Sequence, residues 1–206
     1  MRITGGILRG RLVRVPPGSI RPAMDRMRES VFAALGDIGG CSFLDIFSGS
    51  GVIALEAASR GAEYIEAVEF DQQKRKILLE NVKISPVRIN CRFISAELYV
   101  KRARRPFNII FCEPPFPYKF KWELIEAIAD SKLMSKGSRL LLHRPREDSN
   151  LKDDLNLKDD SDLKEDLNSK EDFKKENSHN PPSKLLLENT RIYGRSLVDF
   201  FTMSTS

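Results

Sequence analysis

The most apolar stretch of the chain, residues 107–112, ends abruptly at Glu113-Pro114-Pro115. A short run rich in Phe and Ile is typical of a strand that is buried on both faces, and such strands belong to parallel sheets covered by helices. Proline has no backbone donor, so the two prolines end the strand. Residues 107–112 therefore predict a central strand in an α/β protein.

Other short apolar runs alternate with segments of helical periodicity. Further strands are predicted over residues 42–46, 64–69, 92–94 and 139–143. The predicted helices cover residues 52–60, 72–83, 96–103 and 122–131. This alternation predicts βαβ units and a mostly parallel, doubly wound sheet. A length of 206 residues suits one domain, which we expect to span residues 1–206.

The two ends of the chain differ from this core. Residues 185–193 and 197–201, joined by a tight turn, predict an antiparallel hairpin that closes the sheet. Residues 1–30 predict a small basic arm, comprising a short hairpin and the start of a first helix capped by Asp25.

Residues 148–184 hold 7 Lys/Arg against 11 Asp/Glu, and the sequence almost repeats every six residues between Leu151 and Lys174. A six-residue period cannot sustain an apolar stripe on a helix. We therefore expect an acidic, low-complexity insertion that is disordered or loosely helical. An acidic segment that binds a partner is the alternative.

Composition excludes several classes of protein. Three cysteines without a CxxC pair and only two histidines give neither a disulfide framework nor a metal site. The N-terminus lacks the apolar core of a signal peptide, and no apolar run approaches the roughly 18 residues of a membrane helix. We expect a cytoplasmic protein that binds neither metal nor membrane, and that is a monomer.

Positive charge is concentrated in the first 28 residues, which contain seven arginines and one acid. Such a density of guanidinium groups suits the binding of phosphates, although a merely solvated basic face is the alternative. The arginines are Arg2, Arg9, Arg11, Arg14, Arg21, Arg26 and Arg28.

A glycine turn, Asp45-Ile46-Phe47-Ser48-Gly49-Ser50-Gly51, follows the strand predicted over residues 42–46. Missing side chains let the backbone approach a ligand at the carboxyl end of a parallel strand. Nucleotide, nicotinamide and S-adenosylmethionine sites all use such turns, and a plain tight turn is a further alternative. The third glycine of the dinucleotide fingerprint is absent, and a carboxylate beside the turn would repel a pyrophosphate. A cationic sulfonium ligand is therefore favoured.

Two more segments end at the same predicted edge of the sheet. Glu69 stands at the end of the next strand, where an acid can accept both hydroxyls of a ribose, although an exposed strand-end acid is as good an interpretation by itself. Ser95-Ala96, after the third strand, would lie near an adenine.

Glu113-Pro114-Pro115-Phe116 is the segment that decides among these chemistries. A carboxylate at the end of the most buried strand costs free energy unless it has a partner. The carboxylate and the proline carbonyls can accept the two N–H bonds of a planar amine, and Phe116 can stack against its ring. A proline turn with an incidental acid is the alternative.

The motifs taken together resemble the bacterial 16S ribosomal RNA guanine-N2 methyltransferases. The resemblance rests on residues 2–6, 21–32, 45–51, 69, 113–116 and 191–194. It implies a Rossmann-like class I fold and S-adenosylmethionine-dependent methylation of the exocyclic N2 amine of a guanine in small-subunit RNA. The arginine arm would bind the RNA backbone, and the base would leave its stack to reach the pocket.

The resemblance also implies roles for individual residues. The cofactor pocket would be lined by Asp45, Phe47, Ser48, Gly49, Ser50, Gly51, Glu69, Ser95 and Ala96. The catalytic residues would be Glu113, Pro114, Pro115 and Phe116. Two departures stand out: this chain has Glu113 where the family normally has Asp, and Ala23 where it usually has Thr. Ser95 also stands where an acid is common.

Other functions stay open from sequence. A DNA or other RNA amino-methyltransferase would use the same acid-Pro-Pro-aromatic motif. A non-catalytic ribosome-binding protein is compatible with the change to Glu113, and a nicotinamide-dependent dehydrogenase is a more distant alternative.

Overall fold

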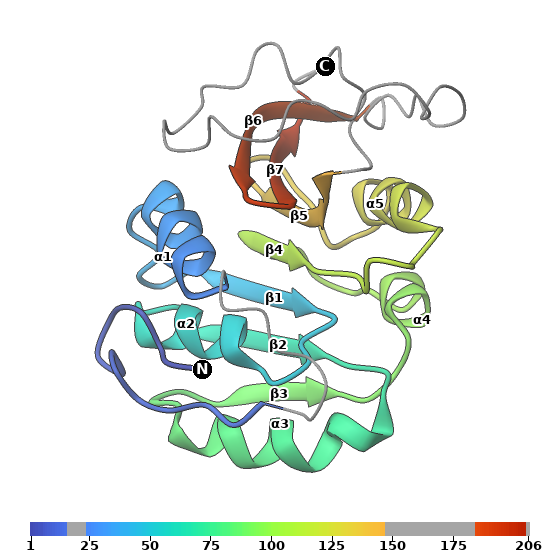
Figure 1. The fold of residues 1–206 in the computed structure, drawn as a ribbon. Helices are drawn as coiled ribbons and strands as arrows, with labels where there is room; N and C mark the ends of the chain where they lie inside the picture. The colour runs from blue at the N-terminus through green and yellow to red at the C-terminus, as the bar shows by residue number, and fades with distance from the viewer. Residues whose placement is uncertain (16–23, 147–183, 205–206) are drawn as a thin grey trace, which may run out of the picture.

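Strand β4 (Ile109–Cys112) lies in the middle of the sheet, between β1 (Ser42–Ile46) and β5 (Arg139–Pro145). The structure, a computed structural model, describes residues 1–15, 24–146 and 184–204. Its sheet has seven strands in the order β3-β2-β1-β4-β5-β7-β6 (Figure 1). The other strands are β2 (Tyr64–Val68), β3 (Ile89–Arg92), β6 (Leu185–Tyr193) and β7 (Ser196–Met203).

Strands β1 to β5 pair in parallel, whereas β7 pairs antiparallel with both of its neighbours, β5 and β6. Every residue of β1 and β4 is buried, as expected for strands covered on both faces. The order of strands reverses between β1 and β4, which places a ligand-binding crevice beyond their carboxyl ends. The predictions of a doubly wound, mostly parallel sheet and of a closing hairpin are confirmed.

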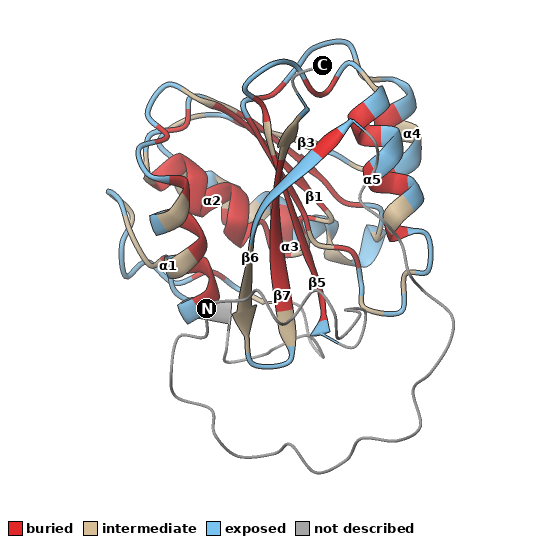
Figure 2. Ribbon diagram, turned by 90° about the horizontal axis from the view of Figure 1, so that it is seen from above, coloured by how far each residue is buried: buried red, intermediate tan, exposed pale blue. Residues whose placement is uncertain are grey.

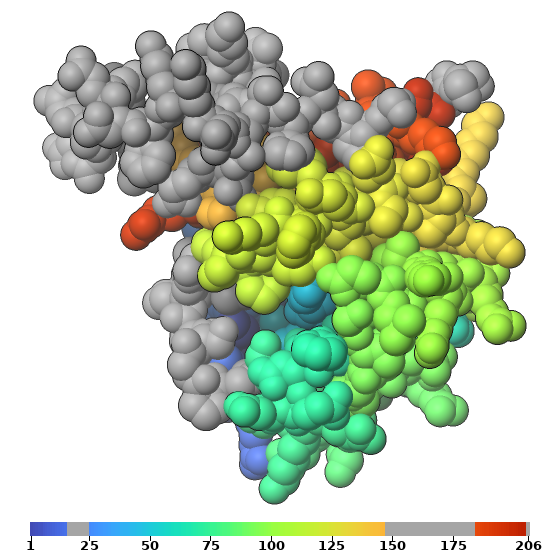
Figure 3. Space-filling view, turned by 90° about the vertical axis from the view of Figure 1, so that its right-hand side faces the viewer, coloured from blue at the N-terminus to red at the C-terminus, as the bar shows by residue number. Residues whose placement is uncertain are grey.

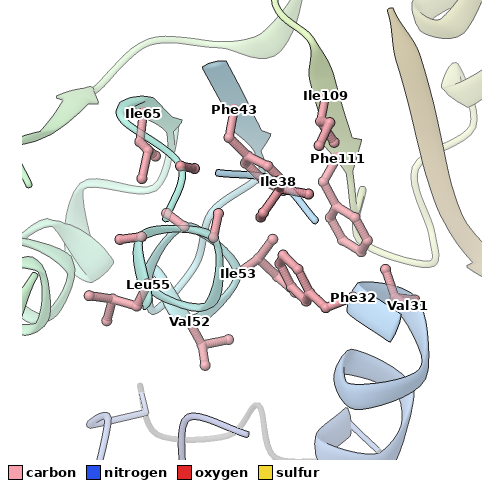
Figure 4. Packing of buried hydrophobic residues seen from close by; sticks show 14 of the residues in the cluster. Val31, Phe32, Ile38, Phe43, Val52, Ile53, Leu55, Ile65, Ile109 and Phe111 are labelled. Carbon is pink, nitrogen blue, oxygen red and sulfur yellow. The ribbon is translucent and has the colours of Figure 1, made fainter. Parts of the chain in front are cut away.

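Helices cover both faces of the sheet (Figure 2). On one face, α1 (Met24–Leu35) and α2 (Val52–Ser59) pack against β1, β4 and β5 around Phe32, Phe43 and Phe111 (Figure 4). On the other face, α4 (Ala96–Lys101) and α5 (Lys121–Asp130) form a second apolar cluster with the alternate strand residues. The segment after β2 contains η1 (Gln72–Lys74), α3 (Arg75–Asn81) and η2 (Val82–Ile84).

The first 15 residues form a short antiparallel hairpin, as predicted. A bridge joins Arg2 and Leu12, and the backbone hydrogen bonds on either side of it also cross between the two segments. The turn between the segments is bonded to the end of α2, where Ile7 N donates to Ser59 O and Leu8 N donates to Ser59 Oγ. The arm is therefore held by its own pairing and by α2.

Two predictions about local structure need correction. The third strand is Ile89–Arg92, which begins three residues earlier and ends two residues earlier than predicted, because a partly exposed edge strand has little apolar periodicity. Asp25 lies inside the first turn of α1, which begins at Met24. Residues 148–183 of the predicted acidic insertion lie outside the described residues. The last residue of the insertion, Lys184, is described, and its ammonium pairs with Asp130.

Candidate active site

The turn between β1 and α2 adopts a conformation that needs its glycines. Phe47, Gly49 and Gly51 have φ values of 65°, 55° and 79°, in the left-handed region. A Cβ atom on Gly51 would lie 2.5 Å from Leu78 Cδ1. Ser48 N donates to Val68 O over 2.9 Å, which fixes the turn against the end of β2. A strained aromatic residue in such a turn is a feature of functional sites.

Asp45 is fully buried beneath this turn. Its Oδ2 accepts a hydrogen bond from Ala54 N, in the first turn of α2, over 3.2 Å. Burial, and then the negative charge of Glu113, raise the pKa of Asp45 to about 8. The carboxyl group therefore holds a proton at neutral pH until a positive charge arrives nearby. A cationic ligand with a sulfonium and an ammonium group fits this requirement.

Glu69 joins the loops that follow β1 and β2. Its Oε2 accepts from Gly49 N and its Oε1 accepts from Asp71 N, each over 2.8 Å. The side chain is almost completely buried. A carboxylate oxygen has two acceptor positions, so both oxygens of Glu69 retain one for a ribose hydroxyl.

Ser95 is the N-terminal cap of α4. Its Oγ accepts from Leu98 N over 3.2 Å and so caps α4, and Ala96 is buried in the first turn of that helix. The predicted adenine contact at Ser95 and Ala96 stays a prediction.

Glu113 follows β4 and lies on the same face of the sheet as Asp45. Its backbone N donates to Ile46 O over 3.2 Å, which holds it beside the end of β1. Its Oε1 lies 2.8 Å from Nδ1 of His143, a residue of β5. The Glu113 side chain is 21% exposed, so it can still meet a molecule in the crevice.

The aromatic residues after Glu113 form one wall of the crevice. Phe116 contacts the ring of His143 edge-on, with ring centres 5.8 Å apart. Pro115 O accepts from Tyr118 N over 2.8 Å, and the Tyr118 ring packs edge-on against Phe47. The aromatic segment after β4 is thereby tied to the glycine turn after β1.

These strand ends share one hollowed face of the molecule. Figure 3 looks onto this face, where a recess lies between the teal segment that follows β2 and the yellow-green segment that follows β4. The structure thus brings the predicted residues Asp45, Glu69 and Glu113 to one edge of the sheet. Sequence reasoning missed His143 and Tyr118. One of only two histidines, at the end of a strand predicted to be buried, was a signal for His143.

The prediction that Arg28 binds RNA is wrong. Its side chain is fully buried, and its guanidinium donates to Glu56 Oε1, to Asp25 Oδ1 and to the carbonyl of Arg2. These contacts join α1, α2 and the N-terminal arm. Arg28 is therefore a structural residue with no surface to offer a phosphate.

The remaining arginines of the arm keep their predicted role as a hypothesis. Arg14 pairs with Glu80 over 2.9 Å but is 79% exposed. Arg21 lies outside the described residues. The exposed ones are Arg2, Arg9, Arg11, Arg14 and Arg26.

Comparison with known proteins identifies the family. The family model described as conserved hypothetical protein 95 matches residues 1–165. The chain belongs to this family. A curated relative, ribosomal RNA small subunit methyltransferase D of Escherichia coli strain K12, is 35% identical over 136 residues, covering 64% of this chain and 68% of the relative. The protein of that name from Buchnera aphidicola (strain APS) is 29% identical over 154 residues, 71% of this chain and 79% of its own.

A solved structure shares the fold of this chain. The Escherichia coli protein yhhF superposes with a TM-score of 0.77 at 23% identity, covering 100% of this chain and 99% of that chain. The predicted resemblance to this methyltransferase family and the predicted Rossmann-like class I fold are both confirmed.

Among the described residues no helix is long and apolar enough to cross a membrane, and no group of three metal-ligating side chains occurs.

Proposed function

We propose that the protein transfers a methyl group from S-adenosylmethionine to the N2 amine of a guanine in small-subunit ribosomal RNA. The relatives named for this RNA support the substrate class. The observation that carries the reaction is the position of Glu113, a partly exposed carboxylate beside the buried Asp45 and Glu69.

The residues divide into two sets. Asp45, Gly49 and Glu69 would hold S-adenosylmethionine, since they combine acidic groups with a turn whose backbone is accessible. When bound, this cofactor supplies an electrophilic methyl group on sulfur. Glu113, the Pro114 carbonyl and Phe116 would hold the base.

Glu113 acts on the amine. The N2 amine of guanine is conjugated with the ring and is a poor nucleophile, so acceptors at Glu113 and the Pro114 carbonyl orient it and increase lone-pair density on nitrogen. Transfer of the methyl group to the nitrogen would leave the amine with one proton more than the neutral product carries. The amine then loses one proton to Glu113, which passes it to water.

A thiol nucleophile does not fit this site. Burial raises the pKa of Cys112 far above its usual range, and burial also raises the pKa of Cys91. Both thiols therefore stay protonated at neutral pH, whereas the thiolate is the reactive form.

The exposed arginines of the N-terminal arm would contact RNA phosphates, and we expect a cytoplasmic monomer to carry out the reaction. The test is transfer of tritiated methyl groups to small-subunit particles from a bacterial strain that lacks its own enzyme. Digestion of the RNA followed by mass spectrometry should identify N2-methylguanosine. A parent protein that methylates no RNA, yet binds the cofactor, would show a non-catalytic relative.

A second candidate is methylation of an adenine N6 amine in RNA. A tRNA1(Val) (adenine(37)-N6)-methyltransferase of Flavobacterium psychrophilum is 35% identical over 78 residues, although this covers only 36% of this chain and 33% of the relative. The same digestion distinguishes the two, because this activity would yield N6-methyladenosine from a transfer RNA substrate.

A further inference from the structure

His143 lies beside the proposed catalytic carboxylate without being part of any predicted motif. Its Nδ1 is 2.8 Å from Glu113 Oε1, and only 6% of its side chain is exposed. Its Nε2 is buried without a hydrogen-bond partner within the described part of the chain. Buried polar atoms without partners are rare in proteins, so the location of this ring calls for a functional explanation.

The contact with Glu113 bears on which ring nitrogen of His143 carries the hydrogen. An ionised carboxylate can only accept hydrogen bonds, so His143 Nδ1 must carry the hydrogen and donate it to Glu113. In the neutral ring Nε2 then carries a lone pair. The predicted tautomer is therefore Nδ1–H.

Packing holds the His143 ring in place. His143 lies opposite Val198 in the ladder between β5 and β7, and Val198 is buried. Phe116 covers the ring edge-on from the segment after Glu113. A donor fixed in this way can restrict the rotation of a flexible side chain that it contacts.

Glu113 is such a flexible side chain. It has one methylene more than the Asp that the family resemblance implies at this position, so its carboxylate has more rotational freedom. The bond from His143 uses one acceptor position of Oε1 and restrains the plane of the carboxylate, which leaves both positions of Oε2 to accept from a substrate amine.

We propose that His143 is a positioning residue that holds the Glu113 carboxylate in the orientation required for methyl transfer. The inference rests on the proposed function, because it assigns Glu113 to the substrate amine. His143 itself touches neither the base nor the cofactor. Its effect passes entirely through Glu113.

The hydrogen bond can be tested without any turnover. The chain has two histidines, His143 and His179, so NMR of protein labelled with nitrogen-15 in histidine gives two ring systems, and His179→Gln assigns them. We expect the Nδ1–H tautomer at His143 in the parent and a changed Nδ1 signal in Glu113→Gln. An Nε2–H tautomer, or a His143 ring that does not respond to Glu113→Gln, overturns the proposal.

A double-mutant cycle tests the positioning role. In the parent background, His143→Ala should lower kcat about tenfold to a hundredfold, since a displaced catalytic group costs that much, and should leave the Kd for S-adenosylmethionine unchanged. In the Glu113→Ala background the same substitution should have no further effect on kcat, because there is no carboxylate left to position.

Two further variants separate positioning from mere folding. His143→Asn keeps an N–H donor near the place of Nδ1 and should restore most of kcat, whereas His143→Leu fills the volume without a donor and should not. Ser138→Ala is the matched control, since it removes a buried hydrogen bond to Phe107 O at the opposite end of β5. It should lower the Tm and leave kcat unchanged.

The outcomes distinguish the two proposals. A parent that is inert on every RNA removes the proposed function and this inference with it. An active parent in which His143→Ala lowers kcat equally in both backgrounds, or in which His143→Leu is as active as His143→Asn, overturns the positioning role alone.

Discussion

The guanidinium of Arg28 donates to Glu56 Oε1 over 3.1 Å, and both side chains are completely buried. Glu56 also accepts from Thr4 N and pairs with Arg60, so one carboxylate holds the N-terminal arm, α1 and α2 together. The arm that is expected to meet RNA is therefore anchored to the same helix whose first turn lies over Asp45.

Removing one partner of this pair should destabilise the protein severely. Arg28→Ala breaks a fully buried ion pair and leaves Arg60 as the cation that pairs with Glu56, and the loss of one partner of a buried pair typically costs about 3–5 kcal/mol. Urea denaturation should show that loss in the free energy of unfolding. Arg9→Ala, an exposed control on the same arm, should change it by less than about 0.5 kcal/mol. Equal effects of the two substitutions would mean that Arg28 is exposed in solution.

Exposed arginines of the arm should contribute to RNA affinity through charge. Each of Arg9→Ala, Arg11→Ala and Arg14→Ala should flatten the slope of log affinity against log salt concentration by about 0.7–0.9, the value for one lost phosphate contact. The slope is measured by filter binding or fluorescence anisotropy over a salt series. A triple variant that keeps the slope of the parent would place the RNA on another surface.

Glu69 should govern cofactor affinity. Glu69→Ala removes the charged acceptor proposed for the ribose and should weaken S-adenosylmethionine binding by about 1.5–3 kcal/mol in calorimetry. Because Glu69 also accepts from Gly49 N, Glu69→Gln serves as a comparison that keeps an acceptor for the backbone. Unchanged affinity in both variants would show that the ribose binds at a different residue.

Asp45 should make stability fall as pH rises. Its pKa is about 8 in the folded protein against 3.8 for an unperturbed Asp, so between these values the folded state binds the additional proton. Stability from this group is thus greatest below about pH 4 and declines toward pH 8, by at most about 1.4 kcal/mol per pH unit. Unfolding measurements at pH 5 and pH 8 should show a smaller decline in Asp45→Asn than in the parent.

The same proton should be released when a cation binds. S-adenosylmethionine brings positive charge to Asp45 and favours its ionised form, so binding at pH 7 should release up to one proton. Calorimetry in two buffers of different ionisation enthalpy measures this number. The Asp45→Asn variant should not release this proton. Equal proton release from the parent and the variant would show that the charge of the cofactor does not act on Asp45.

Sequence patterns predicted the middle of the sheet because its central strands are buried on both faces. The runs that became β1 and β4 are short and apolar, and each stops at a turn with a clear chemical signature, Gly49 and Gly51 after one and Pro114-Pro115 after the other. At β3 the pattern failed, because only one residue of that edge strand is fully buried and periodicity reports burial.

The sequence by itself determined the order of elements, the glycine turn and the acids at the strand ends, since each depends on residues close together in the chain. Tertiary structure alone decided which charged groups meet. In the sequence Arg28 cannot be distinguished from the other arginines of the arm, but in the structure it is buried against Glu56. His143 contacts Glu113, which lies 30 residues away in the chain. Such pairings follow from how helices cover a sheet and how parallel strands align, and no local pattern encodes either.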